Sequence, residues 1–253
     1  MLKLYARLAG KSIRLAVRGW PSVVMIPAYT MILVVAAQLV GRLGPAGPFL
    51  MGIVLAFLVS SYLHLVWMAV GGRKIGFGDI RDSFLAHFWD VIGVMFATWV
   101  IQFVVGFGTQ GLGDRGHIVS VLADLTMVVF FNPVPELIYL GGARVRSFGL
   151  FSFGTLIESG RFISVHWIEW LLPNALFAAA LLAPIGVLHQ QPLAQRLLAF
   201  QQFFSLEGVA TTVLTYPRWL IPFVLLFVNW AMVFRGLLFE ELTARVRRPR
   251  PWP

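Results

Sequence analysis

The chain has 253 residues, of which 58% are hydrophobic and only 12% are charged, and its formal net charge is +9. A soluble domain carries about 25% charged residues, so this composition excludes a soluble domain with an ordinary polar surface. The chain contains no cysteine, which excludes disulfides, thiolate metal sites and cysteine nucleophiles within it. These figures favour an integral membrane protein.

Six apolar stretches are each long enough to cross a bilayer as a helix. A hydrocarbon core about 30 Å thick needs about 20 helical residues. In chain order, the predicted spans are 20–41, 48–70, 88–108, 117–141, 167–188 and 217–239. The predicted fold is therefore all-α, a single polytopic membrane domain over 1–253 with six transmembrane helices and further helices at the membrane surface.

The basic residues are divided unequally between the two sides of the predicted membrane. Most of the 20 Lys and Arg lie in the N-terminal segment, in the turns after the second and fourth spans, and at the C-terminal end. The other three connections hold Arg42, Arg115, Arg196 and Arg218. Cytoplasmic loops carry the excess of basic residues, so both termini are predicted to be cytoplasmic in a bacterial inner membrane. The charge then determines topology, and no nucleic-acid partner is predicted.

Residues 2–19 are predicted to form an amphipathic helix on the membrane surface. Basic residues recur at spacings of three and four and form one stripe, made of Lys3, Arg7, Lys11, Arg14 and Arg18. Apolar surface off this stripe is supplied by Leu4, Leu8, Leu15 and Ala16. We expect the stripe to contact the anionic headgroups of the inner leaflet. The alternative is a poorly ordered basic tail.

Two segments that precede predicted spans resemble each other. Residues 75–92 read IGFGDIRDSFLAHFWDVI and residues 151–168 read FSFGTLIESGRFISVHWI, with a Phe-Gly pair and an acid-Ser pair in common. The N-terminal KSIRLAVRGW has the pattern of a more divergent copy. Together they predict a three-fold repeat of a surface helix and a helical hairpin, with units at about 1–72, 73–148 and 149–253.

The fourth predicted span carries unusual polar groups. Asp124 lies near its outer end, and Asn132, Pro133, Pro135 and Glu136 lie in its inner half. The two prolines remove backbone donors, so the helix is expected to break there and free carbonyl groups. An unwound polar segment of this kind forms ion or substrate sites in many transporters. It also fits a plain structural kink, and both interpretations remain open.

Polar residues of other spans extend this candidate site. If the units are related by a pseudo-three-fold axis, polar residues of the second, fourth and sixth spans converge in the inner half of the bundle, where Arg235 pairs with Glu136. The candidate intramembrane polar site is made of Asp124, Asn132, Glu136, His64, Asn229 and Arg235.

Two His-x-x-acid pairs lie at the starts of spans, His87 with Asp90 and His166 with Glu169. Each pair shares one helical face and is a weak candidate for metal binding in a bundle. No third or fourth ligand lies at matching depth in the sequence. A general-base role lacks an identifiable nucleophile. We therefore predict no metal, no cofactor and no catalytic residue.

Three segments resemble a group of six-span bacterial proteins. They are GGRKIGFGDIRDSF and GLFSFGTLIESGRF, ahead of the third and fifth spans, and FEELTARVRR after the sixth. The group includes the membrane domain fused to some glycerophosphodiester phosphodiesterases. Their catalytic domain is not in this sequence, so the resemblance carries over no catalytic residue. It implies a helical membrane module, acting in envelope maintenance or as a partner subunit.

The predicted topology also resembles the six-span permease subunits of ABC exporters, which have similar length, cytoplasmic ends and an amphipathic N-terminal helix. The chain has no ATPase motif, so a permease would need a separate ATPase. Our first functional hypothesis is a non-enzymatic scaffold or accessory subunit that binds lipid or protein partners. The second is a permease subunit with a polar path near Asn132 and Glu136, and the third is an intramembrane enzyme that uses His166 and Glu169.

Overall fold

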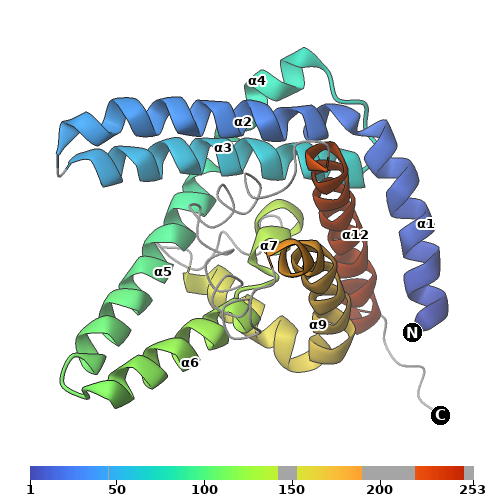
Figure 1. Cartoon of the computed structure of the whole chain (residues 1–253). Helices are drawn as coiled ribbons and strands as arrows, with labels where there is room; N and C mark the ends of the chain where they lie inside the picture. Colours follow the sequence, from blue (N-terminus) through green and yellow to red (C-terminus); the bar gives the residue numbers. More distant parts are fainter. Residues whose placement is uncertain (45, 142–152, 190–219, 248–253) are drawn as a thin grey trace, which may run out of the picture.

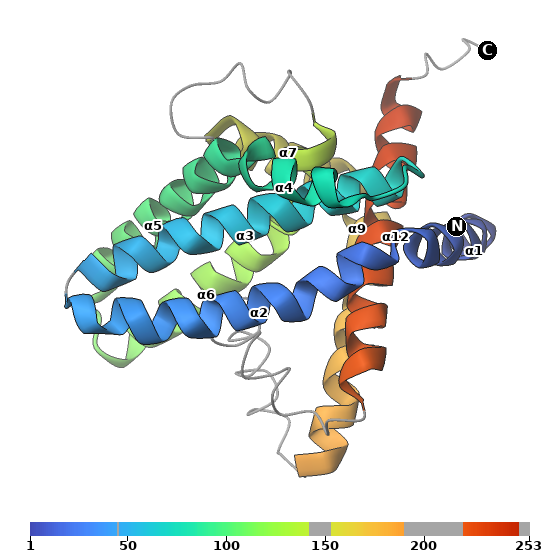
Figure 2. The same cartoon turned by 90° about the horizontal axis from the view of Figure 1, so that it is seen from above.

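The computed structural model describes residues 1–44, 46–141, 153–189 and 220–247. Every regular element within them is a helix. The long helices form three pairs, which point in different directions from a shared base (Figure 1, Figure 2). The pairs are α2 (Trp20–Val40) with α3 (Ala46–Val70), α5 (Phe88–Thr109) with α6 (Asp114–Phe130), and α9 (Phe153–His189) with α12 (Ile221–Arg247).

Five helical segments of the described chain are long and apolar enough to cross a membrane. They are Trp20–Val40, Ala46–Val70, Phe88–Thr109, Ile118–Leu140 and Ile221–Arg245. Each overlaps one of the predicted spans. The remaining prediction, 167–188, falls in α9 and is helical, but it is not among the five. The fold is therefore that of a polytopic helical membrane protein with five candidate spans, and the sixth span stays a prediction.

A shorter helix leads into each pair of long helices. α1 (Leu2–Arg18) precedes α2, α4 (Phe77–Ala86) precedes α5, and the first part of α9 ends at a kink. The backbone turns at Gly19 (φ −87°, ψ 25°), at His87 (φ −128°, ψ 14°) and at His166 (φ −121°, ψ 22°). Similar backbone conformations thus separate the short helix from the long one in all three places.

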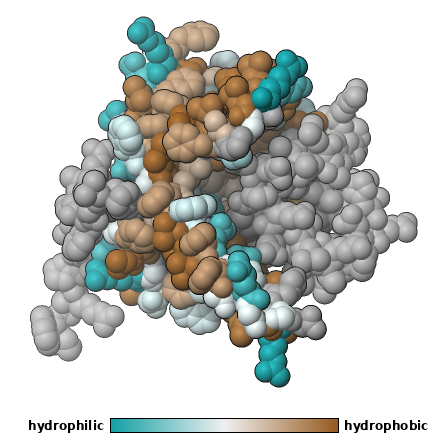
Figure 3. Space-filling model, turned by 90° about the vertical axis from the view of Figure 1, so that its left-hand side faces the viewer, coloured by the Kyte–Doolittle hydropathy of each residue, from teal (hydrophilic) through white to brown (hydrophobic). Residues whose placement is uncertain are grey.

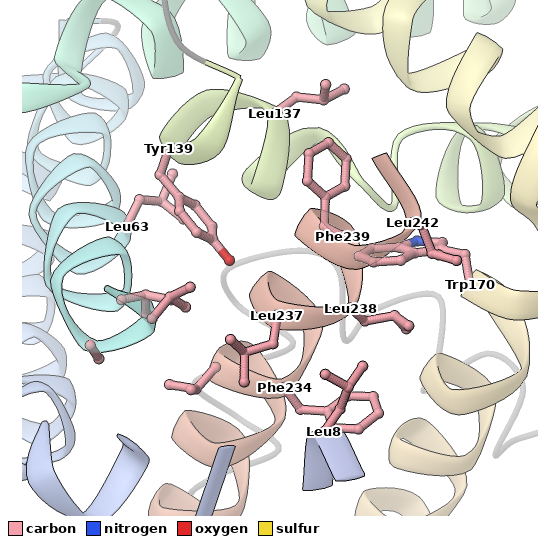
Figure 4. Close-up of a cluster of buried hydrophobic side chains, with 14 of the residues drawn as sticks. Leu8, Leu63, Leu137, Tyr139, Trp170, Phe234, Leu237, Leu238, Phe239 and Leu242 are labelled. Atoms are coloured by element: carbon pink, nitrogen blue, oxygen red, sulfur yellow. The ribbon is translucent and has the colours of Figure 1, made fainter. Parts of the chain in front are cut away.

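α3 and α12 form the centre of the bundle. In the most apolar window of each, 44% of the residues are buried, against 6% in α2. Figure 4 shows core side chains converging from several helices, among them Leu8, Leu63, Tyr139, Trp170 and Leu238. At Gly236, an added Cβ would lie 2.7 Å from both the Tyr139 hydroxyl and the Val70 side chain. Such close approach through small residues is how helices associate inside a membrane.

The outward faces of the long helices are apolar. Their large exposed side chains include Met31, Leu39, Phe103, Phe107 and Leu226. Figure 3 shows apolar residues over much of the described surface on the side where the pairs α2–α3 and α5–α6 end. An apolar surface of this extent is unfavourable in water, whereas lipid tails match it. The surface therefore agrees with a membrane location.

Candidate functional site

The helix break predicted in the fourth span is present. α6 ends at Phe130, residues 131–133 form a turn, and α7 (Val134–Leu140) follows. Pro133 caps α7, and Pro135 lies in its first turn, where a missing N–H is tolerated. The break changes the direction of the chain and places Glu136 at the start of a new helix.

Glu136 and Arg235 form a two-pronged ion pair in the core. Nε of Arg235 lies 2.8 Å from Oε1 of Glu136, and Nη2 lies 2.9 Å from Oε2. The Glu136 side chain is 0% exposed and that of Arg235 is 15% exposed. Nη2 also donates to the carbonyl oxygen of Asn132 at 2.5 Å. The pairing expected from the sequence is therefore present, and the same guanidinium satisfies a carbonyl at the helix break.

Trp170 of α9 completes this arrangement. Its indole Nε1 donates to Oδ1 of Asn132 at 2.8 Å, and the guanidinium carbon of Arg235 lies 5.3 Å from the centre of its ring. Trp170 is fully buried. Asn132, Glu136, Trp170 and Arg235 are hereafter the central polar cluster. It joins the break after α6, α7, α9 and α12 through charged and neutral hydrogen bonds.

Sequence reasoning missed Trp170. Tryptophans near the ends of spans are typical of an aromatic belt at the membrane surface. Trp170 lies close to Trp167 in the sequence and fits the same pattern. One signal was available, because Trp170 lies one turn deeper into the predicted span than Trp167. A buried indole needs a hydrogen-bond acceptor, and the amide of Asn132 supplies it.

The other predicted site residues contact other groups. The convergence predicted in the inner half of the bundle, which did not include Asp124, is seen in the described contacts for Asn132, Glu136 and Arg235. The ring of His64 lies 5.9 Å from that of His87 and 5.2 Å from that of Trp67, so it faces the α4–α5 junction. Asn229 is fully buried, and its Oδ1 accepts a hydrogen bond from Ser22 Oγ at 2.7 Å. Asp124 is half-buried on α6, and the hydrogen bonds described for the central polar cluster do not include it. Each helix can rotate about its own axis, and the hydropathy pattern does not determine this rotation. The rotation therefore separates polar residues that the sequence places at similar depth.

Two phenols in the core have unsatisfied hydroxyl groups. The hydroxyls of Tyr62 and Tyr139 are buried and have no hydrogen-bond partner among the described residues. Tyr139 lies three residues after Glu136, a spacing that puts both on one face of α7. Buried polar groups are nearly always paired, so these two hydroxyls are exceptions to the usual rule.

The two His-acid pairs do not combine into a metal site. Nδ1 of His166 lies 3.8 Å from Oε2 of Glu169. Burial lowers the pKa of His166, against the opposing effect of Glu169. His87 donates its backbone N–H to Ser60 Oγ at 2.9 Å. Within the described residues, no three His, Asp or Glu side chains gather closely enough to hold a metal ion.

α1 has one buried face and one basic face. Leu4, Leu8, Ser12 and Ala16 are buried, and Ser12 Oγ accepts a hydrogen bond from the Trp230 indole of α12 at 2.8 Å. Nη2 of Arg7 lies 3.4 Å from Oε1 of Glu241, which also belongs to α12. The basic stripe is exposed along its whole length, at Lys3, Arg7, Lys11, Arg14 and Arg18. α1 is thus a docked helix with an exposed cationic surface, rather than a loose tail.

No known family, curated protein or solved structure matches the chain. The function therefore has to be inferred from its own geometry. Two features of the described residues bear on it most directly, the central polar cluster inside the bundle and the basic face of α1 on its surface.

Proposed function

We propose that the protein is a non-enzymatic scaffold or accessory subunit of a bacterial inner membrane. The main observation in its support is that the charges at the centre of the bundle neutralise each other. Both carboxylate oxygens of Glu136 are bound to Arg235. A buried ion that loses its partner is strongly destabilising. The pair therefore links α7 to α12, and the carboxylate, with both oxygens bound, is not free to bind a substrate.

The proposed topology has six spans with both termini in the cytoplasm. Its support is the distribution of Lys and Arg and the position of α1, whose buried face packs on α12 while its basic face is exposed. In that orientation the basic stripe from Lys3 to Arg18 faces the anionic headgroups of the inner leaflet. Each basic residue near such a surface contributes about 1 kcal/mol of attraction.

The proposal also includes the three-fold repeat, with units at about 1–72, 73–148 and 149–253. Each short helix carries a fully buried serine, namely Ser12, Ser83 and Ser159. Ser12 bonds Trp230 of α12, Ser83 bonds Ser61 of α3, and Ser159 donates to the carbonyl at the end of α6. Each unit thus contacts the second long helix of the preceding unit, in cyclic order. Related units around a pseudo-three-fold axis would pack in this way.

One observation favours the alternative of a permease subunit. The unpaired hydroxyls of Tyr62 and Tyr139 lie in a bundle that also contains the broken helix and a buried ion pair, as transporter sites do. In that alternative, the two phenols would contact the transported group, and an ATPase would be the partner. Water access to the core and the identity of the partner distinguish this alternative from a scaffold.

Affinity purification of the tagged protein in mild detergent tests the proposal. We expect mass spectrometry to find anionic phospholipid, together with a membrane protein at a constant ratio to the chain. A matched tagged membrane protein of similar size and charge controls for nonspecific lipid. Recovery of an ATPase at a fixed stoichiometry would contradict the scaffold and favour the permease.

A further inference from the structure

The last turn of α1 packs against the end of α3. An added Cβ at Gly19 would lie 2.9 Å from Cβ of Ala69, and one at Gly72 would lie 3.5 Å from Leu15. Gly72 has φ 67° and ends α3 with a turn in which Arg73 N–H bonds the carbonyl of Met68. These contacts fix the turn after α3 beside the basic face of α1.

This packing places the end of α1 beside the turn after α3, and both segments carry basic residues. Arg14 and Arg18 belong to the end of α1, and Arg73 and Lys74 follow α3. All four are exposed, and none forms an ion pair with a carboxylate of the described residues. The nearby acid Asp79 is directed to the backbone instead, because its Oδ2 accepts the N–H of Gly76 at 2.8 Å. Four cations that form no ion pair among the described residues make a surface that attracts anions.

One aromatic ring contacts Arg73, and two exposed aromatic residues lie close in sequence to these cations. The Arg73 guanidinium carbon lies 4.7 Å from the centre of the Trp67 ring. Trp20 at the start of α2 is 61% exposed, and Phe77 at the start of α4 is 94% exposed. Tryptophan at the ends of spans marks the level of lipid headgroups. The four cations therefore lie where headgroup phosphates would be, near the ends of α2 and α3.

We propose that Arg14, Arg18, Arg73 and Lys74 form a binding site for the phosphate of an anionic phospholipid. The arginines offer paired N–H donors that match phosphate oxygens, and the exposed aromatic rings contact the glycerol and upper acyl groups. Basic pockets between transmembrane helices on the cytoplasmic side bind such headgroups in general. This site rests on the proposed function for the membrane orientation of α1, and it names one place where the lipid partner binds.

A charge-matched pair of variants tests the site. The site variant replaces Arg14, Arg18, Arg73 and Lys74 by Gln. The control variant also removes four positive charges, at exposed positions outside the basic stripe of α1: Arg42, Arg115, Arg161 and Arg245. Delipidated protein in neutral detergent is titrated with phosphatidylglycerol, and binding is followed by native mass spectrometry. Unchanged melting temperatures show that both variants remain folded.

We expect the site variant to bind phosphatidylglycerol at least about ten-fold more weakly than the unaltered chain, since the loss of even one charged hydrogen bond to the phosphate lowers affinity by about ten-fold. The loss of affinity in the control variant should be several-fold smaller. An equal loss of affinity in the two variants would overturn a localised site, but it would not contradict the proposal of a lipid-binding scaffold. No loss in either would overturn the site and the proposed lipid contact of α1. Full displacement of the lipid by millimolar inorganic phosphate would assign the site to a free anion instead.

Discussion

Replacing Glu136 by glutamine will lower the free energy of unfolding by about 3–5 kcal/mol, the cost of breaking a buried ion pair. The carboxylate accepts two hydrogen bonds from one guanidinium and is fully buried. In the variant, the amide oxygen of Gln can still accept one hydrogen bond, but the charge of Arg235 has no counterion inside the bundle. Unfolding by sodium dodecyl sulfate in mixed micelles, followed by circular dichroism, measures the change.

Two further variants make this result specific. Changing Glu136 to Leu and Arg235 to Met together removes both charges and should recover much of the loss, because no unpaired ion then remains. Glu158→Gln breaks the exposed pair with Arg161, whose side chains are 47% and 72% exposed, and should cost at most about 1 kcal/mol. If Glu136→Gln costs no more than Glu158→Gln, the buried pair does not hold the bundle together.

Replacing Trp170 by alanine will lower the free energy of unfolding by about 3 kcal/mol, the lower end of the range for a buried tryptophan. The lower end applies because the separated helices are solvated by lipid rather than water, so lost packing dominates the cost. The ring packs edge-on against the rings of Phe162 and Phe239, with distances between ring centres of 5.3 Å and 6.1 Å. Its removal leaves a cavity and also deprives the Asn132 amide of its donor. The same micelle unfolding experiment applies.

Two comparison variants separate packing from hydrogen bonding. Trp99→Ala removes a tryptophan that is 57% exposed on α5, and its effect should be within about 0.5 kcal/mol. Trp170→Phe keeps most of the ring contacts and loses the hydrogen bond to Asn132, so we expect a cost of about 1–3 kcal/mol. Equal effects of Trp170→Ala and Trp99→Ala would show that α9 is not packed against the central polar cluster.

Much of the fold could be predicted from the sequence because a bilayer imposes a length on apolar helices. Five of the predicted spans overlap the helices that the structure identifies as long and apolar enough. The break near Pro133 and the pair Glu136–Arg235 also followed from simple rules. Proline removes a donor, and a buried carboxylate in a membrane needs a cation at matching depth.

The rotation of each helix about its axis could not be predicted in the same way. In water, the apolar face of a helix points inward, but a span in lipid is apolar on every side and its pattern marks no inner face. This is why His64 faces the α4–α5 junction and Asn229 bonds Ser22. For the same reason, neither the role of Trp170 nor the meeting of α1 with the turn after α3 was visible in the sequence.

Cysteine accessibility tests most directly whether the centre of the bundle is sealed. The chain has no cysteine of its own, so a single introduced thiol reports without background. Ala231 is 8% exposed and lies one turn before Arg235 on the same face of α12, whereas Ala244 is exposed near the end of that helix. A scaffold with a dry core predicts that a membrane-impermeant maleimide labels Ala244→Cys from the cytoplasmic side and fails to label Ala231→Cys from either side. Rapid labelling of folded Ala231→Cys would show that water reaches the central polar cluster, and it would contradict the scaffold in favour of a transport path.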